Sequence, residues 1–124
     1  MLTGLSTMDN KKKIEEKLFD SKNQIKSETS NIKYNILLVH EPDIITKFDY
    51  KDYDLILAGH SHGGQVKLPL IGALRYNRGA KKYHNDYYKL KNSDLYISSG
   101  VGTSRVNFRL NNKPSISLYR LVNK

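Results

Sequence analysis

The chain has 124 residues, of which 38% are hydrophobic, so it is the size of one small domain with a modest core. It contains no cysteine, which excludes disulfides, thiolate metal sites and cysteine nucleophiles. No run reaches the roughly 20 apolar residues of a membrane helix, and the amino terminus lacks a signal-peptide pattern. We expect one domain over residues 1–124 without a transmembrane segment, either cytoplasmic or peripheral to a membrane.

The net charge of +9 raises the alternative of a basic nucleic-acid-binding module. Lys11–Lys13 is the only run of three basic residues, and the other lysines are dispersed among Asn, Asp and Tyr. We interpret this distribution first as a solvated surface, which would also suit phosphorylated substrates.

A helix is predicted from about residue 9 to residue 26. Ile14, Leu18 and Ile25 recur at helical spacing on one face, with Lys and Glu opposite them. Three residues offer amino-terminal caps: Ser6, Thr7 and Asp9.

Two apolar runs after this helix predict strands over residues 34–40 and 54–58. Ile44-Ile45 lies between them and indicates a short helix or turn. The β-α-β alternation favours an α/β fold with a mostly parallel first half.

The second half of the chain is broken by glycines into short pieces. Strands are predicted over residues 94–98, 106–110 and 115–121, with Asn111-Asn112 as a turn between the last two. We therefore expect mostly antiparallel short strands in this half.

Two histidines, His60 and His62, directly follow the second apolar run. On extended backbone, side chains at i and i+2 point to the same side, so both imidazoles would face one small site. Gly59 and Gly63-Gly64 flank the pair and let the backbone turn sharply. This pattern is typical of metal ligands at the carboxyl end of a sheet strand.

A third histidine, His40, ends the first apolar run, just before Pro42. Proline stops a strand because it has no N–H for the ladder. If the two strands are parallel neighbours, His40, His60 and His62 converge on one metal site.

These residues resemble the later motifs of the calcineurin-like metallophosphoesterases, a histidine after a strand and then Gly-His-x-His. Here they read Leu38-Val39-His40-Glu41-Pro42 and Gly59-His60-Ser61-His62. The continuation Gly63-Gly64-Gln65-Val66-Lys67-Leu68-Pro69 is similar to a bacterial branch that includes membrane-associated lipid and cell-envelope phosphoesterases. The resemblance runs from about Leu2 to the end of the chain.

The resemblance implies that residues 1–124 are the carboxyl-terminal portion of a single calcineurin-like phosphoesterase domain. Its fold would be part of a metallophosphatase-type αββα sandwich, with a further strand over residues 2–5. The complete family site holds two divalent ions (Mn, Fe or Zn), which clamp a phosphate ester or pyrophosphate for hydrolysis. By this resemblance, His40 and His60 hold one metal and His62 the other.

The amino-terminal ligand motifs of the family, Asp-x-His, Gly-Asp-x-x-Asp and Gly-Asn-His, do not occur in this sequence. Three imidazoles without a bridging carboxylate leave two cations under-coordinated, so we expect the isolated chain to be inactive. The resulting hypothesis is an incomplete half of a metal-dependent phosphoesterase that acts on a phosphorylated small molecule or lipid-type substrate. The alternative is a non-catalytic remnant or a half that depends on a partner, such as the missing amino-terminal half.

We assign no catalytic residue from the sequence and leave the substrate-binding residues open. Residues 99–103 could form a phosphate-binding nest of backbone N–H groups, although a glycine turn that leaves a strand is the simpler interpretation. His84 lies among lysines and tyrosines and is expected at the surface. Four arginines could contact a phosphate but are more often surface cations: Arg75, Arg78, Arg105 and Arg109.

Overall fold

The computed structural model describes residues 1–6, 10–27 and 34–122 of the chain. A five-stranded sheet organises these residues, in the order β1-β2-β3-β7-β6. The strands are β1 (Leu2–Leu5), β2 (Ile36–Val39), β3 (Leu55–Ala58), β7 (Asp94–Ile97) and β6 (Tyr87–Lys89). The pairs β1–β2, β2–β3 and β3–β7 are parallel, and β6–β7 is antiparallel. The mostly parallel α/β arrangement predicted from the sequence is therefore confirmed.

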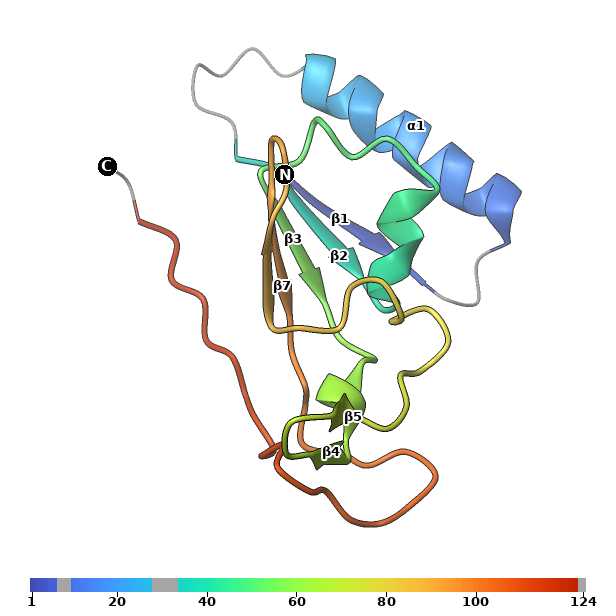
Figure 1. Cartoon of the computed structure of the whole chain (residues 1–124). Coiled ribbons are helices and arrows are strands. Elements are labelled where there is room, and N and C mark those ends of the chain that lie inside the picture. The colour runs from blue at the N-terminus through green and yellow to red at the C-terminus, as the bar shows by residue number, and fades with distance from the viewer. Residues whose placement is uncertain (7–9, 28–33, 123–124) are drawn as a thin grey trace.

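One helix, α1 (Lys11–Ser27), connects β1 to β2 and lies against one side of the sheet (Figure 1). Asn10 caps it, because its Oδ1 accepts a hydrogen bond from the backbone N–H of Lys13 at 2.9 Å. Among the caps expected from the sequence, Ser6 is not at the cap position, and Thr7 and Asp9 lie outside the described residues.

The hydrophobic core lies between α1 and the sheet. Side chains alternate along β1, β2 and β7, and every second one is buried on the helix side. The core residues on these elements are Ile14, Leu18, Leu5, Leu37, Val39, Leu95 and Ile97, and the fully buried Ile56 of β3 joins them.

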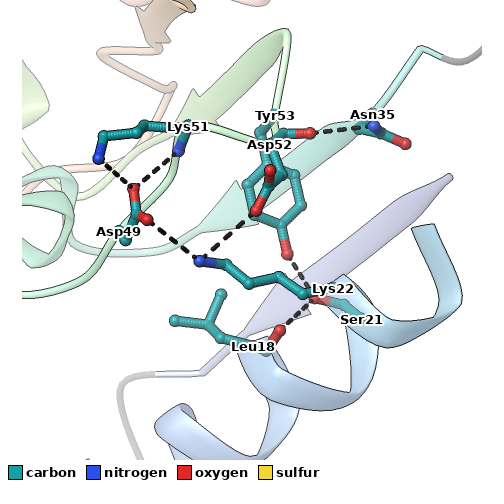
Figure 2. A network of polar contacts seen from close by, with 8 residues as sticks. All are labelled: Leu18, Ser21, Lys22, Asn35, Asp49, Lys51, Asp52 and Tyr53. Atoms are coloured by element: carbon teal, nitrogen blue, oxygen red, sulfur yellow. Dashed lines mark hydrogen bonds and ion pairs between the residues drawn. The ribbon is translucent and has the colours of Figure 1, made fainter. Parts of the chain in front are cut away.

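A polar network joins α1 to the loop before β3 (Figure 2). The hydroxyls of Ser21 and Tyr53 lie 2.5 Å apart, and both side chains are buried. Lys22 places Nζ 3.4 Å from a carboxylate oxygen of Asp49 and 3.5 Å from one of Asp52. The helix is thus fixed to the sheet layer by polar as well as apolar contacts.

The opposite face of the sheet carries exposed apolar side chains. Leu2, Leu38 and Tyr96 point away from α1 and are exposed to solvent. The carboxyl-terminal segment (residues 98–122) runs apart from the strands in Figure 1, but its Tyr119 ring makes an edge-to-face contact with the Tyr96 ring, with centroids 5.4 Å apart. Parallel strands are normally covered on both faces, so this face is a candidate contact surface for a further layer.

The second half of the chain contains a small antiparallel hairpin, β4 (Lys67–Leu68) and β5 (Gly72–Ala73). The short strands of this half, β4, β5 and β6, all pair antiparallel as expected. The strands predicted over residues 106–110 and 115–121 are wrong, because these segments form no ladder apart from a bridge between Val66 and Leu110. None of the helices in the described ranges is long and apolar enough to cross a membrane.

Candidate metal centre

Two of the predicted ligands, His40 and His60, lie at the carboxyl ends of neighbouring parallel strands. His40 follows β2 directly, and His60 follows β3 after Gly59. The backbone N–H of Gly59 donates to the His40 carbonyl at 3.3 Å, which ties the two strand ends together. The apolar strands thus deliver both imidazoles to one edge of the sheet.

The two rings are tilted by 53° relative to each other and place Nε2 of His40 2.9 Å from Nδ1 of His60. On its other side, His60 places Nε2 2.9 Å from the carbonyl oxygen of Arg78. A carbonyl can only accept, so His60 Nε2 donates this bond, and in the neutral imidazole Nδ1 is then the nitrogen with the lone pair. This is the arrangement of many metal-ligating histidines, whose second ring N–H donates to a backbone carbonyl.

His62 does not join this pair in the way the sequence suggested. The expectation of extended backbone through the motif is wrong, because His60 and His62 have φ of 62° and 45° and Ser61 is in the right-handed helical region. The Ser61 hydroxyl accepts a hydrogen bond from the N–H of Gly63 at 3.0 Å and stabilises the turn. His62 therefore points elsewhere, with Nδ1 3.5 Å from Nη2 of Arg109.

The surroundings of His62 favour its neutral form. Burial is the largest cause that lowers the pKa of His62, followed by the positive charge of Arg109. Within the described residues, no group of three or more His, Asp and Glu side chains is placed to hold a metal. The pair His40 and His60 is therefore the part of the predicted site that the structure brings together.

The two glycines after His62 are required by close packing. Gly63 and Gly64 have φ of 57° and 76°, which favours glycine. A Cβ on Gly63 would lie 2.6 Å from Oδ1 of Asn112, and one on Gly64 would overlap Ala73. The glycines of the motif thus let η2 (His62–Gly64) fit against the hairpin and the carboxyl-terminal segment.

Gln65 connects the histidine motif to the carboxyl-terminal segment, a role that the sequence analysis missed. Its Nε2 donates to the carbonyls of Val106 and Phe108 at 2.7 and 3.0 Å. Its Oε1 accepts from the N–H of Ser104 at 2.7 Å. The signal in the sequence was a glutamine next to two glycines, which does not reveal a partner 39 to 43 positions away.

Arg109 holds the turn at residues 99–103, which sequence reasoning considered as a phosphate nest. Its guanidinium donates to the carbonyls of Ser99 and Gly100 at 2.8 and 3.0 Å, and also to that of Gly102. The carbonyl oxygens of this turn therefore bind the Arg109 guanidinium, which agrees with the simpler interpretation of residues 99–103 as a glycine turn that leaves a strand.

His84, expected at the surface, is partly buried, and its ring lies 4.0 Å from that of Tyr76.

A cavity of about 330 Å³ lies beside His62. Its walls are mainly apolar, with two arginines and several polar groups among them. The lining includes Val66, Leu74, Val106, Phe108, Arg75 and Arg105. Apolar walls with a few cationic groups suit a phosphorylated ligand that also has an apolar part.

Curated proteins with related sequences share one description. The chain is 36% identical to the uncharacterized metallophosphoesterase YkuE of Bacillus subtilis (strain 168) over 95 residues, 77% of this chain and 33% of YkuE. It is 37% identical to the uncharacterized metallophosphoesterase Cj0846 of Campylobacter jejuni over 79 residues, 64% of this chain and 20% of the relative. It is 33% identical to the phosphodiesterase YaeI of Escherichia coli (strain K12) over 87 residues, 70% of this chain and 32% of YaeI.

The chain belongs to the metallophosphoesterase family. It spans a third or less of the length of these three relatives. No family model matches it, and no solved structure does either.

Metallophosphoesterases depend on divalent metal ions, and the donor set of this chain fits such an ion in part. His40 Nε2 and His60 Nδ1 are 2.9 Å apart. Two neighbouring ligand atoms around one ion, each about 2.1 Å from it, have a similar separation. His60 already presents a lone pair, and His40 would have to carry its hydrogen on Nδ1 to present a second one. His40 and His60 therefore fit two positions around a single ion, and further ligands have to come from elsewhere.

Proposed function

We propose that this chain is the carboxyl-terminal portion of a metal-dependent phosphoesterase domain. Its complete form would hydrolyse phosphate ester or pyrophosphate bonds at a site with two metal ions. The observation that carries the proposal is the 2.9 Å approach of His40 Nε2 and His60 Nδ1 at the ends of two parallel strands. The printed names of the relatives, metallophosphoesterase and phosphodiesterase, support the class of reaction.

In this proposal, His40 and His60 hold one ion and His62 holds the other, with Mn, Fe or Zn as candidates. When bound, the ions supply positive charge that polarises the phosphoryl group and stabilises the charge that develops on its oxygens. The carbonyl of Arg78 fixes the His60 ring. Burial and the charge of Arg109 keep His62 in the neutral form that a ligand requires.

The remaining ligands would come from the part of the domain that the relatives have and this chain lacks. The exposed apolar side chains on the face opposite α1 support a missing second layer, as in an αββα sandwich. A phosphorylated small molecule or a lipid-type compound is the proposed substrate. The cavity beside His62, with Arg75 and Arg105 in an apolar wall, supports that choice.

The test is complementation with the portion of YkuE that this chain does not match. We expect the two parts together to hydrolyse bis(p-nitrophenyl) phosphate in the presence of Mn²⁺. The His60→Ala variant should abolish the activity, whereas His84→Ala, at a histidine outside the proposed ligand set, should preserve it. Equal activity of wild type and His60→Ala would contradict the proposed role of the histidine.

A non-catalytic remnant is the second candidate. It is favoured by the finding that the described residues contain no cluster of three possible ligands. Failure of complementation, with both parts folded and associated, would support the remnant. Sustained metal-dependent turnover by the chain alone would exclude it.

A further inference from the structure

The basic charge of the protein is concentrated in its second half. Residues 55–124 contain twelve Lys and Arg and two Asp and Glu, whereas residues 1–54 contain nine basic and ten acidic residues. Between Asp54 and Asp86 there is no acidic residue at all. In the fold, Asp43 and Glu41 lie against residues 79–83 of this stretch. The β4–β5 hairpin precedes those residues, and its nearest cations in the sequence are Lys67 and Arg75.

The tip of this hairpin exposes large apolar side chains. Leu70 is fully exposed and Ile71 is 73% exposed, and Leu74, at the base of the hairpin after β5, is 60% exposed. Leu70 also has φ of 65°, a conformation in which turns normally use Gly or Asn. A leucine with this φ adds backbone strain, and the exposure of its apolar side chain to water is also unfavourable. Both features are typical of a residue that makes a contact outside the fold.

We propose that the β4–β5 hairpin docks the protein onto an anionic lipid bilayer. Leu70 and Ile71 would enter the boundary between headgroups and acyl chains, while Lys67 in β4 and Arg75 after β5 pair with lipid phosphates. Apolar side chains at a tip and cations at its base are the pattern of interfacial membrane contacts. The proposal rests on the hairpin and its charge and is independent of the proposed phosphoesterase activity.

A bilayer fits this hairpin better than a protein layer does. The side chains that suit a second sheet lie on the flat face of β1, β2 and β7, whereas Figure 1 places β4 and β5 beyond the ends of these strands. A polypeptide cover would need acidic groups opposite Lys67 and Arg75, while an anionic bilayer supplies them over its whole surface. Leu74 and Arg75 also line the cavity beside His62, so docking would hold that cavity near the lipid surface.

A tryptophan probe tests insertion directly, because the chain contains no tryptophan. The full chain carrying Ile71→Trp is mixed with vesicles of phosphatidylcholine, alone or with phosphatidylglycerol. Leu118→Trp is the matched control, since Leu118 is 95% exposed but lies on the carboxyl-terminal segment. We expect a blue shift of the emission for Ile71→Trp with the anionic vesicles and none for the control. Absence of the shift, or an equal shift of both probes, would overturn the proposal.

Vesicle co-sedimentation is the second measurement. It distinguishes binding by insertion of apolar side chains from binding by electrostatic attraction alone. Replacing both Leu70→Ser and Ile71→Ser should weaken binding to the anionic vesicles by at least about tenfold, because two apolar side chains no longer leave water. The matched pair Ile116→Ser and Leu118→Ser, at 88% and 95% exposure, should bind as wild type. Equal binding of all three proteins would show that net charge alone attracts the chain, and would overturn the proposal.

Discussion

Gln65 donates a hydrogen bond from Nε2 to the backbone carbonyl of Val106 at 2.7 Å, across 41 positions of the sequence. Together with its bonds to Phe108 and Ser104, this contact fixes the carboxyl-terminal segment beside the histidine motif. The buried Gln65 carboxamide thus positions the carboxyl-terminal segment, whereas a strand in a sheet is positioned by a ladder of backbone hydrogen bonds.

Gln65→Glu should release the carboxyl-terminal segment. The carboxylate keeps the acceptor for Ser104 but loses both donations and faces two carbonyl oxygens. We expect a loss of about 1–3 kcal/mol in the free energy of unfolding, since buried partners are left unsatisfied. Faster hydrogen exchange at the amide of Leu110, which donates to the backbone carbonyl of Gln65, would locate the effect. Gln24→Glu, on the exposed surface of α1, is the control and should leave this amide unchanged.

Tyr53→Phe should weaken the attachment of α1 to the sheet. It removes the hydroxyl 2.5 Å from Ser21 but keeps the buried ring, so we expect a loss of about 0.5–1.5 kcal/mol in the free energy of unfolding. Urea denaturation measures this difference. Tyr50→Phe, at a partly buried tyrosine of the same loop, should cost less, and an equal cost would contradict the importance of the Ser21 contact.

The pair Tyr87 and Asp94 predicts a pH dependence on β6 and β7. The Tyr87 hydroxyl donates to Asp94 at 2.7 Å, which raises the pKa of Tyr87 from 10.0 to about 12. The same bond, followed by that from Lys89, lowers the pKa of Asp94. The stabilising effect of Asp94 is therefore present above its unfolded pKa of about 3.9 and is lost as the pH falls through its lower folded pKa. The stabilising effect of Tyr87 is present below pH 10 and is lost as the pH rises through about 12.

An NMR titration of the tyrosine rings checks this pair. Asp94→Asn should move the pKa of Tyr87 back towards 10.0, because the carboxylate that opposes phenolate formation is gone. Asp86→Asn is the control for a general change of charge and should leave the Tyr87 titration near 12. A pKa of Tyr87 that is the same in wild type and in Asp94→Asn would show that the hydrogen bond is absent in solution.

The face of the sheet opposite α1, which carries exposed apolar side chains, should make the isolated chain bind hydrophobic dyes and associate with itself. Leu38→Lys places a charge on this face, and we expect it to reduce dye fluorescence and association without a change in the circular dichroism spectrum. Phe19→Lys, on the exposed side of α1, controls for the added charge. A monodisperse wild-type monomer that unfolds cooperatively and binds no dye would contradict the expectation of a missing layer.

The sheet strands could be predicted from the sequence because their apolar runs are continuous and end at polar or turn residues. Residues 36–39 and 55–58 follow this rule, and residues 94–97 add Leu, Tyr and Ile after Asp94. The segment over residues 106–110 alternates apolar and polar residues, which also favours a strand, but it forms a single bridge. Its hydrogen bonds go instead to the Gln65 side chain, and no local pattern encodes a partner so distant in sequence.

The candidate site could be predicted in part for a similar reason. His40 and His60 follow directly from parallel strand ends, so their approach was expected. The direction of His62 depends on the turn at Ser61 and on packing of Gly64 against Ala73. A two-residue periodicity cannot describe a motif whose histidines both have positive φ.

Metal titration of the chain by calorimetry tests the central claim most directly. Because His40 and His60 supply two converging nitrogens and His62 stands apart, we predict that Zn²⁺ or Mn²⁺ binds weakly and with at most one ion per chain. The binding should disappear in His60→Ala and persist in His84→Ala. Two tight sites in the wild-type chain, or binding that is unchanged in His60→Ala, would contradict the assignment of these histidines as one part of an incomplete metal centre.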